Sequence, residues 1–159
     1  MMVIALLLIL FPAFCCDTNE WNGITPFRST RVDVEKILGK PLHSSSNMSQ
    51  YKTKNENVMV VFAEKPCGGI RELSRETSPN ALVVLMEVNP ITRPKISDYK
   101  LEPTKFQRTI DELKNQVIYS DLKDGITIVE DATDHTVVQF GYTPEKSFAE
   151  EYCKKASSH

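Results

Sequence analysis

The stretch that decides the fold is ITPFRSTRVDVEKILGKP, residues 24–41, because it carries the signals for both ends of a short helix. Thr30 is a good N-cap, since its hydroxyl can accept a hydrogen bond from a free backbone N–H of the first turn. Asp33 lies where its carboxylate can complete a capping box and suits the positive helix end. Gly39 can take the left-handed conformation that ends helices, and Pro41 prevents continuation. We therefore expect a helix that starts after Thr30 and ends before Gly39.

One side of this helix is apolar, with its stripe at helical spacing on Val34, Ile37 and Leu38. Two interpretations are open for the polar residues on and before it. In the first, Trp21, Arg28 and Arg31 form a candidate binding surface. In the second, the charges are caps and solvated positions, and the Trp21 indole packs the N-terminal segment onto the body of the domain.

The first 16 of the 159 residues resemble a targeting segment. Residues 3–11 form an apolar run of nine, too short for the roughly 20 residues that span a bilayer as a helix. A proline and mostly small residues follow, and the chain turns polar at Asp17. This pattern predicts a secretory signal peptide over residues 1–16 and a single exported domain, periplasmic or extracellular, over residues 17–159. An uncleaved membrane anchor and a lipid anchor at Cys15 or Cys16 are the alternatives.

The remaining composition excludes several classes of partner. The net charge is −2, and no basic stripe stands out, so we expect no nucleic-acid partner. No other segment approaches transmembrane length, so membrane contact is expected only through the signal segment or a lipid anchor.

Two cysteines remain in the expected mature domain, Cys67 and Cys153. In an exported protein, two separated cysteines most simply form one disulfide. Their separation is 86 residues, for which the chain-entropy model gives a stabilisation of about 4 kcal/mol. Two free buried thiols are the alternative. A metal site is disfavoured, because no second cysteine or histidine lies at ligand spacing.

The rest of the chain indicates strands joined by polar turns, with two further helices. A second helix is expected from near Pro103, with its stripe on Phe106, Ile110 and Leu113, and a third after Pro144. The expected strands cover residues 51–53, 58–63, 81–88, 117–120, 126–129 and 136–142. This order predicts the α+β class, an antiparallel sheet with helices on one face, and two tandem helix-plus-three-strand units over residues 24–90 and 100–143.

The run STRVDVEKILGKP, followed by a loop and a strand led by Tyr51, resembles two exported groups. One is the small outer-membrane lipoproteins of the barrel-assembly machinery, and the other is the beta-lactamase inhibitor protein type of fold. The likeness covers Ile24 to Ala63 and implies a helix-plus-meander fold without catalytic residues. The whole chain also resembles a group of uncharacterised exported bacterial proteins, through WNGI at residues 21–24, the hairpin over residues 51–62, Cys67 and the turn DGI at residues 124–126.

No familiar catalytic pattern is present in the sequence. The histidines, His43, His135 and His159, lack a cysteine, serine or second histidine at a spacing typical of a triad or metal site. Glu130, Asp131 and Asp134 surround a tight turn, where carboxylates more often hydrogen-bond the backbone than transfer protons. We therefore expect no cofactor, no metal and no enzymatic activity.

The leading hypothesis is an exported, non-enzymatic protein that binds another protein or forms part of an envelope complex. The first alternative is a small-molecule or lipid-binding module that uses the sheet face. The second is a hydrolase with an unfamiliar site, which a cluster of His43 or His135 with two acids in a cleft would favour.

Overall fold

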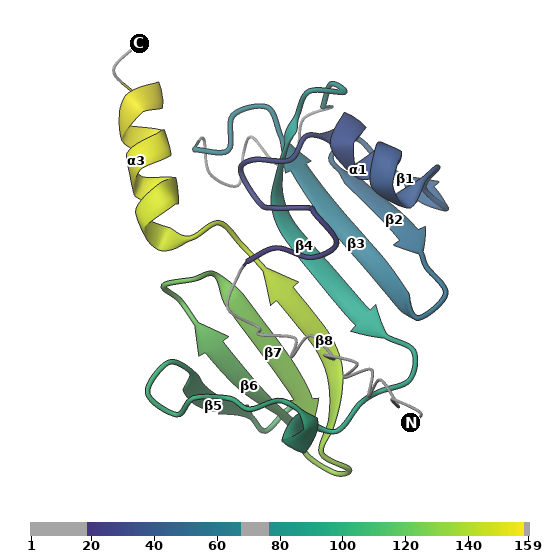
Figure 1. The fold of residues 1–159 in the computed structure, drawn as a ribbon, viewed down its shortest axis with the longest axis vertical. Coiled ribbons are helices and arrows are strands. Elements are labelled where there is room, and N and C mark those ends of the chain that lie inside the picture. The colour runs from purple at the N-terminus through teal and green to yellow at the C-terminus, as the bar shows by residue number, and fades with distance from the viewer. Residues whose placement is uncertain (1–18, 68–76, 158–159) are drawn as a thin grey trace, which may run out of the picture.

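The computed structural model describes residues 19–67 and 77–157. The expected signal peptide and both cysteines considered for lipidation lie outside the described residues. Eight strands form one antiparallel sheet in the order β1-β2-β3-β4-β8-β7-β6-β5 (Figure 1). The sheet consists of two four-stranded meanders whose last strands, β4 and β8, lie side by side at its centre.

The first meander follows α1 (Arg31–Leu38) and contains β1 (His43–Ser44), β2 (Met48–Lys52), β3 (Glu56–Ala63) and β4 (Leu82–Pro90). A connection with one short 3-10 helix, η1 (Ile96–Asp98), leads to the second meander. This contains β5 (Gln107–Asp111), β6 (Gln116–Asp121), β7 (Ile126–Asp131) and β8 (Thr136–Tyr142), and α3 (Lys146–Ala156) follows it. In Figure 1, α1 lies over the first meander, and α3 stands beside the sheet beyond the end of β8.

The helix predicted from the opening stretch is confirmed, together with both of its ends. The Thr30 hydroxyl accepts from the backbone N–H of Asp33 at 3.3 Å, and the Asp33 carboxylate accepts from the backbone N–H of Thr30 at 2.8 Å. These reciprocal bonds complete the capping box. Gly39 follows the last turn with a φ of 79°, which few residues other than glycine adopt.

The α+β class is wrong, because the fold is mainly β: the sheet dominates and only two short α-helices are described. The helix expected from Pro103 is absent, and β5 occupies residues 107–111. Of its supposed stripe, only Phe106 packs against a core, while Ile110 is 54% exposed and Leu113 is 100% exposed at a hairpin tip. The apolar spacing therefore predicted the wrong element, because backbone pairing with β6 makes this segment a strand.

Each meander has its own cluster of buried apolar residues, and Phe140 of β8 packs against both clusters. The first core joins α1 to the sheet and contains ten buried residues: Ile24, Val34, Tyr51, Val58, Val60, Phe62, Ala81, Val83, Met86 and Val88. The second is smaller and centres on Ile126, Ile128 and Val137. In the described part of the chain the connection between the meanders covers it, and no α-helix does, through Ile96, Tyr99, Leu101 and Phe106.

Three consecutive hairpins of the second meander have the same construction. Each has a four-residue loop that follows an aspartate and ends on a left-handed residue, with the aspartates at 111, 121 and 131. The left-handed residues are Asn115, Gly125 and His135, with φ of 53°, 71° and 58°. Each aspartate accepts a backbone N–H from within its own loop, at 2.9 to 3.2 Å. The spacing is therefore a ten-residue structural repeat.

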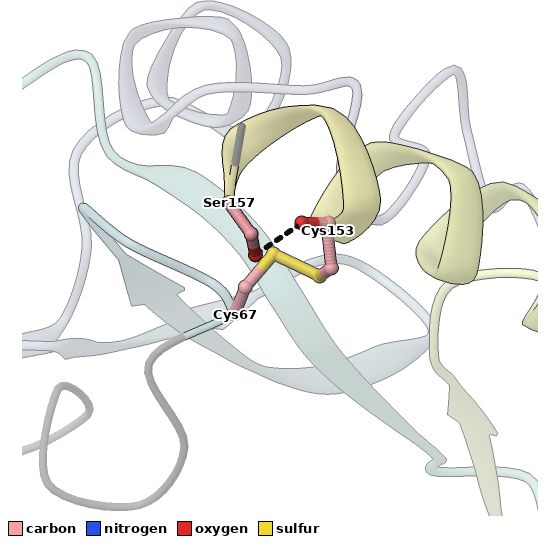
Figure 2. Close-up of a disulfide and its surroundings, with 3 residues drawn as sticks. All are labelled: Cys67, Cys153 and Ser157. Atoms are coloured by element: carbon pink, nitrogen blue, oxygen red, sulfur yellow. Dashed lines mark hydrogen bonds between the residues drawn. A yellow bond between two sulfur atoms is a disulfide. The ribbon is translucent and has the colours of Figure 1, made fainter. Parts of the chain in front are cut away.

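Cys67 and Cys153 form the predicted disulfide, with Cα atoms 5.5 Å apart (Figure 2). Cys67 follows β3 of the first meander, and Cys153 lies on α3, which follows the second. On this helix the Ser157 hydroxyl donates to the Cys153 carbonyl at 2.8 Å. A structural disulfide is typical of an oxidising, exported compartment. Across residues 19–67 and 77–157, no helix is long and apolar enough to cross a membrane.

Candidate functional site

The three residues of the candidate binding surface contact different parts of the molecule. Trp21 is half-buried and packs against the first core. Arg28 is exposed, with its guanidinium 4.7 Å from the centre of the Phe148 ring on α3. Arg31 is only 9% exposed and points inward from the first turn of α1. Of the three, Arg31 alone makes a dense set of polar contacts.

The acceptors of the Arg31 guanidinium in the described part of the chain are all uncharged. Its Nη1 lies 3.1 Å from the Ser49 hydroxyl and 3.3 Å from the Ser44 hydroxyl. Its Nη2 lies 2.6 Å from the Thr77 hydroxyl and 3.1 Å from the Ser46 carbonyl. Its Nε is buried and has no hydrogen-bond partner within residues 19–67 and 77–157.

The surrounding chain holds this side chain in place from two sides. The Arg31 backbone N–H donates to the Ala81 carbonyl at 2.9 Å, which ties the start of α1 to the segment before β4. The guanidinium carbon lies 4.3 Å from the centre of the Phe62 ring, a buried residue of β3. The ring contributes a cation–π contact and closes one face of the guanidinium. Arg31 is thus fixed, with its polar edge toward β1 and the β1–β2 loop.

The charge of Arg31 has no paired carboxylate among residues 19–67 and 77–157. Glu64 is close enough to feel it. Hydrogen bonds from the Ser78 side chain and backbone lower the pKa of Glu64, and the charge of Arg31 lowers it further. Glu64 accepts from the Ser78 backbone N–H instead of pairing with Arg31. Among the described residues, Arg31 is therefore a nearly buried cation that hydroxyls, a carbonyl and the Phe62 ring contact directly, with Glu64 acting on it without a direct bond.

A surface pocket of about 460 Å³ opens beside this guanidinium. Its lining in the described part of the chain is mostly hydroxyl-bearing: Arg31, Ser44, Ser45, Ser46, Thr77 and Pro79. No histidine or carboxylate is among these residues, so none of the described lining residues can act as a base that activates a serine for nucleophilic attack. The described lining residues can recognise a ligand by hydrogen bonds and positive charge.

The sequence alone did not predict the hydroxyl groups of this pocket, because the serine-rich stretch over residues 42–50 is typical of a loop. Ser44 belongs to β1, and Ser49 to β2. Ser49 is fully buried, which is unusual for a polar residue without a role in a network. Three serines in a row, with another at 49, were the available signal. Thr77 had none, because it joins the site only through the fold.

A second polar cluster lies at the other end of the sheet, around Glu130. This carboxylate is 3% exposed, with Oε2 2.7 Å from the Tyr119 hydroxyl and Oε1 2.6 Å from Nδ1 of His135. Burial raises the pKa of Tyr119, and the hydrogen bond to Glu130 raises it further. His135 is 70% exposed and closes the β7–β8 hairpin.

This cluster brings together one histidine and one acid, and both carboxylate oxygens are already hydrogen-bonded. Asp131, the adjacent acid, pairs instead with Arg93 at 2.9 Å. The cluster thus clamps β6, β7 and the last hairpin loop together. Sequence indicated Glu130 and His135 but gave no signal for Tyr119. No group of metal-ligating side chains occurs in the described residues.

The chain was compared with protein-family models, with curated proteins and with solved structures, and none of the three comparisons finds a match. The resemblances expected from residues 24–63 therefore stay predictions.

Proposed function

We propose that this chain is an exported, non-enzymatic protein that binds another protein, and that the Arg31 pocket is the contact site. The observation that carries the proposal is a nearly buried arginine, without a paired carboxylate among the described residues, beside an open, hydroxyl-lined pocket. A rigidly held guanidinium and several rotatable hydroxyls suit a ligand that supplies acceptors. The disulfide supports export, because such bonds persist in oxidising compartments.

Photo-crosslinking at one residue tests this proposal directly. A photoreactive amino acid replaces Ser45, which lines the pocket and is exposed. The matched control carries the same amino acid at Leu113, which is fully exposed at the β5–β6 hairpin on another part of the sheet. Each protein is irradiated in the secreted and envelope material of the producing cells. We expect one discrete protein adduct from position 45 and none from position 113. Equal adducts at both positions, or no adduct at 45, would overturn the proposal.

A small-molecule ligand is the second candidate, favoured by the pocket volume of about 460 Å³. Ligand pockets commonly enclose roughly 300 to 1,000 Å³. A small ligand would leave position 45 without a protein adduct, while a pool of cell metabolites would raise the melting temperature of the purified protein. Failure of both readouts would count against the pocket as a binding site.

A further inference from the structure

We infer that the Arg31 pocket is an oxyanion site, which recognises a carboxylate, phosphate or sulfate group. The inference rests on the proposed function, since it names the chemical group through which a bound partner is held. For a protein partner that group is a carboxylate, from an acidic side chain or the chain end. For a small ligand, a phosphate or sulfate has the same shared chemistry of a compact, negatively charged set of oxygen acceptors.

The charge of Arg31 has no paired carboxylate in the described part of the chain. Arginine stays protonated at every accessible pH, so Arg31 carries a full positive charge while it is only 9% exposed. Taking a charge out of water is costly unless an opposite charge compensates it. Among the described residues the four acceptors of this guanidinium are three hydroxyls and one carbonyl, all neutral. An anion in the adjacent pocket would supply the compensating charge.

The side of the guanidinium that faces the pocket can offer hydrogen-bond donors to a ligand. The Phe62 ring covers one face of the guanidinium, so a ligand must approach from the pocket, which Ser44 lines. The bond from Nη1 to Ser44 is the longest of the four at 3.3 Å, and Ser44 is exposed. An incoming oxygen can therefore replace Ser44 on Nη1, and the freed hydroxyl can rotate to donate to the same ligand. Ser45 and Ser46 add two more hydroxyls from the lining.

The residues that line the pocket make it selective for anions. The lining of the described part contains a cation and four hydroxyls and no carboxylate, so it repels a metal ion and offers little to an apolar ligand. Charge-assisted hydrogen bonds from a guanidinium to an oxyanion are roughly twice as strong as neutral ones. The β1–β2 loop thus places several hydrogen-bond donors around one fixed positive charge.

The test uses the purified mature chain labelled with ¹⁵N, titrated separately with sodium acetate, phosphate and sulfate. Sodium chloride at matched ionic strength is the control for screening. We expect saturable amide shifts confined to residues 44–46 and 77 and to the N–H groups of Arg31. Preference for acetate assigns the pocket to carboxylates, and preference for phosphate or sulfate assigns it to those groups. Shifts that do not saturate, or that chloride reproduces, mean an adventitious ion only and overturn the inference.

Two sets of variants make the outcome specific. In Arg31→Gln binding should disappear, whereas Arg31→Lys keeps the charge without the fork and should bind roughly tenfold more weakly. The double variant Ser45→Ala with Ser46→Ala tests the pocket without touching the core, because Ser46 holds Arg31 through its backbone carbonyl. It should fold normally and bind the preferred anion several-fold more weakly. Arg93→Gln, which removes an exposed arginine on the second meander, is the matched control and should bind as the parent does.

The results for the anion and for the partner can be told apart. Saturable oxyanion binding with no protein adduct at position 45 supports the oxyanion site and overturns the protein-binding proposal. A protein adduct at position 45 without oxyanion binding supports the proposed function and overturns this inference. Unchanged anion affinity in both Arg31→Gln and the serine double variant would also overturn it.

Discussion

The two meanders of this sheet have the same number of strands but are held by different means. The first is covered by α1, whose capped turns place Val34 into a core of ten buried residues. Among the described residues no α-helix covers the second, and three buried residues form the centre of its core. Its regularity lies in the hairpins, where an aspartate and a left-handed residue recur every ten residues. Packing defines the first meander, and local turn chemistry defines the second.

The difference matters because little of the sheet joins the halves. β4 and β8 pair over residues 86–88 only, whereas β3 and β4 pair along their whole length. The disulfide provides a covalent connection, since it links Cys67, which follows β3, to α3 (Figure 2). No residue of α3 is fully buried, and its ring contacts are made by Phe148 and Tyr152, the latter against Phe27. A covalent link therefore secures a helix that packing secures poorly.

The largest effect is expected from the double variant Cys67→Ser with Cys153→Ser. The disulfide spans 86 residues, so its loss should lower the free energy of unfolding by about 4 kcal/mol. Urea unfolding of oxidised parent and variant measures this difference. Limited proteolysis should then cleave first around α3. A variant as stable as the parent, with α3 equally protected, would show that the helix docks without the bond.

Gly125, in the middle hairpin of the second meander, should be the next most sensitive position. Its φ is 71°, and an added Cβ would lie 2.2 Å from the Thr143 carbonyl oxygen, a backbone atom. Gly125→Ala should therefore cost roughly 3 kcal/mol, from left-handed strain together with a forced backbone shift. Gly23→Ala is the matched control, because its φ is 81° and its nearest neighbour is a side-chain atom 3.9 Å away.

The control should lose only about 1 kcal/mol, the cost of left-handed backbone for alanine. Both values come from thermal or urea unfolding of the single variants. Equal losses at the two positions would mean that strain alone matters and that the close approach of residues 125 and 143 relaxes freely.

A pair of valines compares the two cores under the same chemical change. Val60 on β3 and Val137 on β8 are both fully buried, each in its own cluster. Val60→Ala should cost about 2 to 3 kcal/mol, because the helix-backed core cannot collapse into the cavity. Val137→Ala should cost about 1 to 1.5 kcal/mol, because the irregular connection over it can move inward. Equal costs, or the reverse order, would contradict the distinction drawn between the meanders.

The difference between the two meanders also explains which elements could be predicted from the sequence. The first helix and its caps were predictable because Thr30, Asp33 and Gly39 act on backbone atoms within a few residues of themselves. The strands at residues 58–63, 81–88 and 136–142 were predictable from their β-branched and apolar content. Tight turns at residues 121–125 and 130–135 also agree with the structure, since Gly125 and His135 take left-handed conformations there.

The helix predicted from Pro103 does not form, because its apolar stripe has helical spacing but the turn residues that follow it are those of a hairpin. Residues 111–115 carry the same aspartate and left-handed pair as the two following hairpins, and this ten-residue recurrence marks residues 107–111 as a strand. The Arg31 pocket was beyond local signals. Arg31 and Ser49 are 18 residues apart, and Arg31 and Thr77 are 46 apart, so only the folded sheet brings them together.

The smallest effect is expected at acidic pH. It allows the turn aspartates of the second meander to be compared with the capping aspartate of the first. A backbone hydrogen bond from Thr133 and then the Arg93 side chain lower the pKa of Asp131. The side chain and then the backbone of Thr136 lower the pKa of Asp134. In α1, the Thr30 side chain and backbone do the same to the pKa of Asp33.

A carboxyl group with a lowered pKa in the folded state stabilises the protein above its ordinary value of about 3.9, and this contribution is lost as the pH falls below that value. Unfolding measured from pH 7 to pH 2 should therefore show stability falling below pH 4. Asp131→Asn and Asp134→Asn should each flatten that fall slightly, and Asp33→Asn likewise. Carboxyl ¹³C titration should find all three groups below the ordinary value. Ordinary values at 131 and 134 with a lowered value at 33 would mean that the hairpin aspartates do not hold their loops, and that the second meander depends on packing after all.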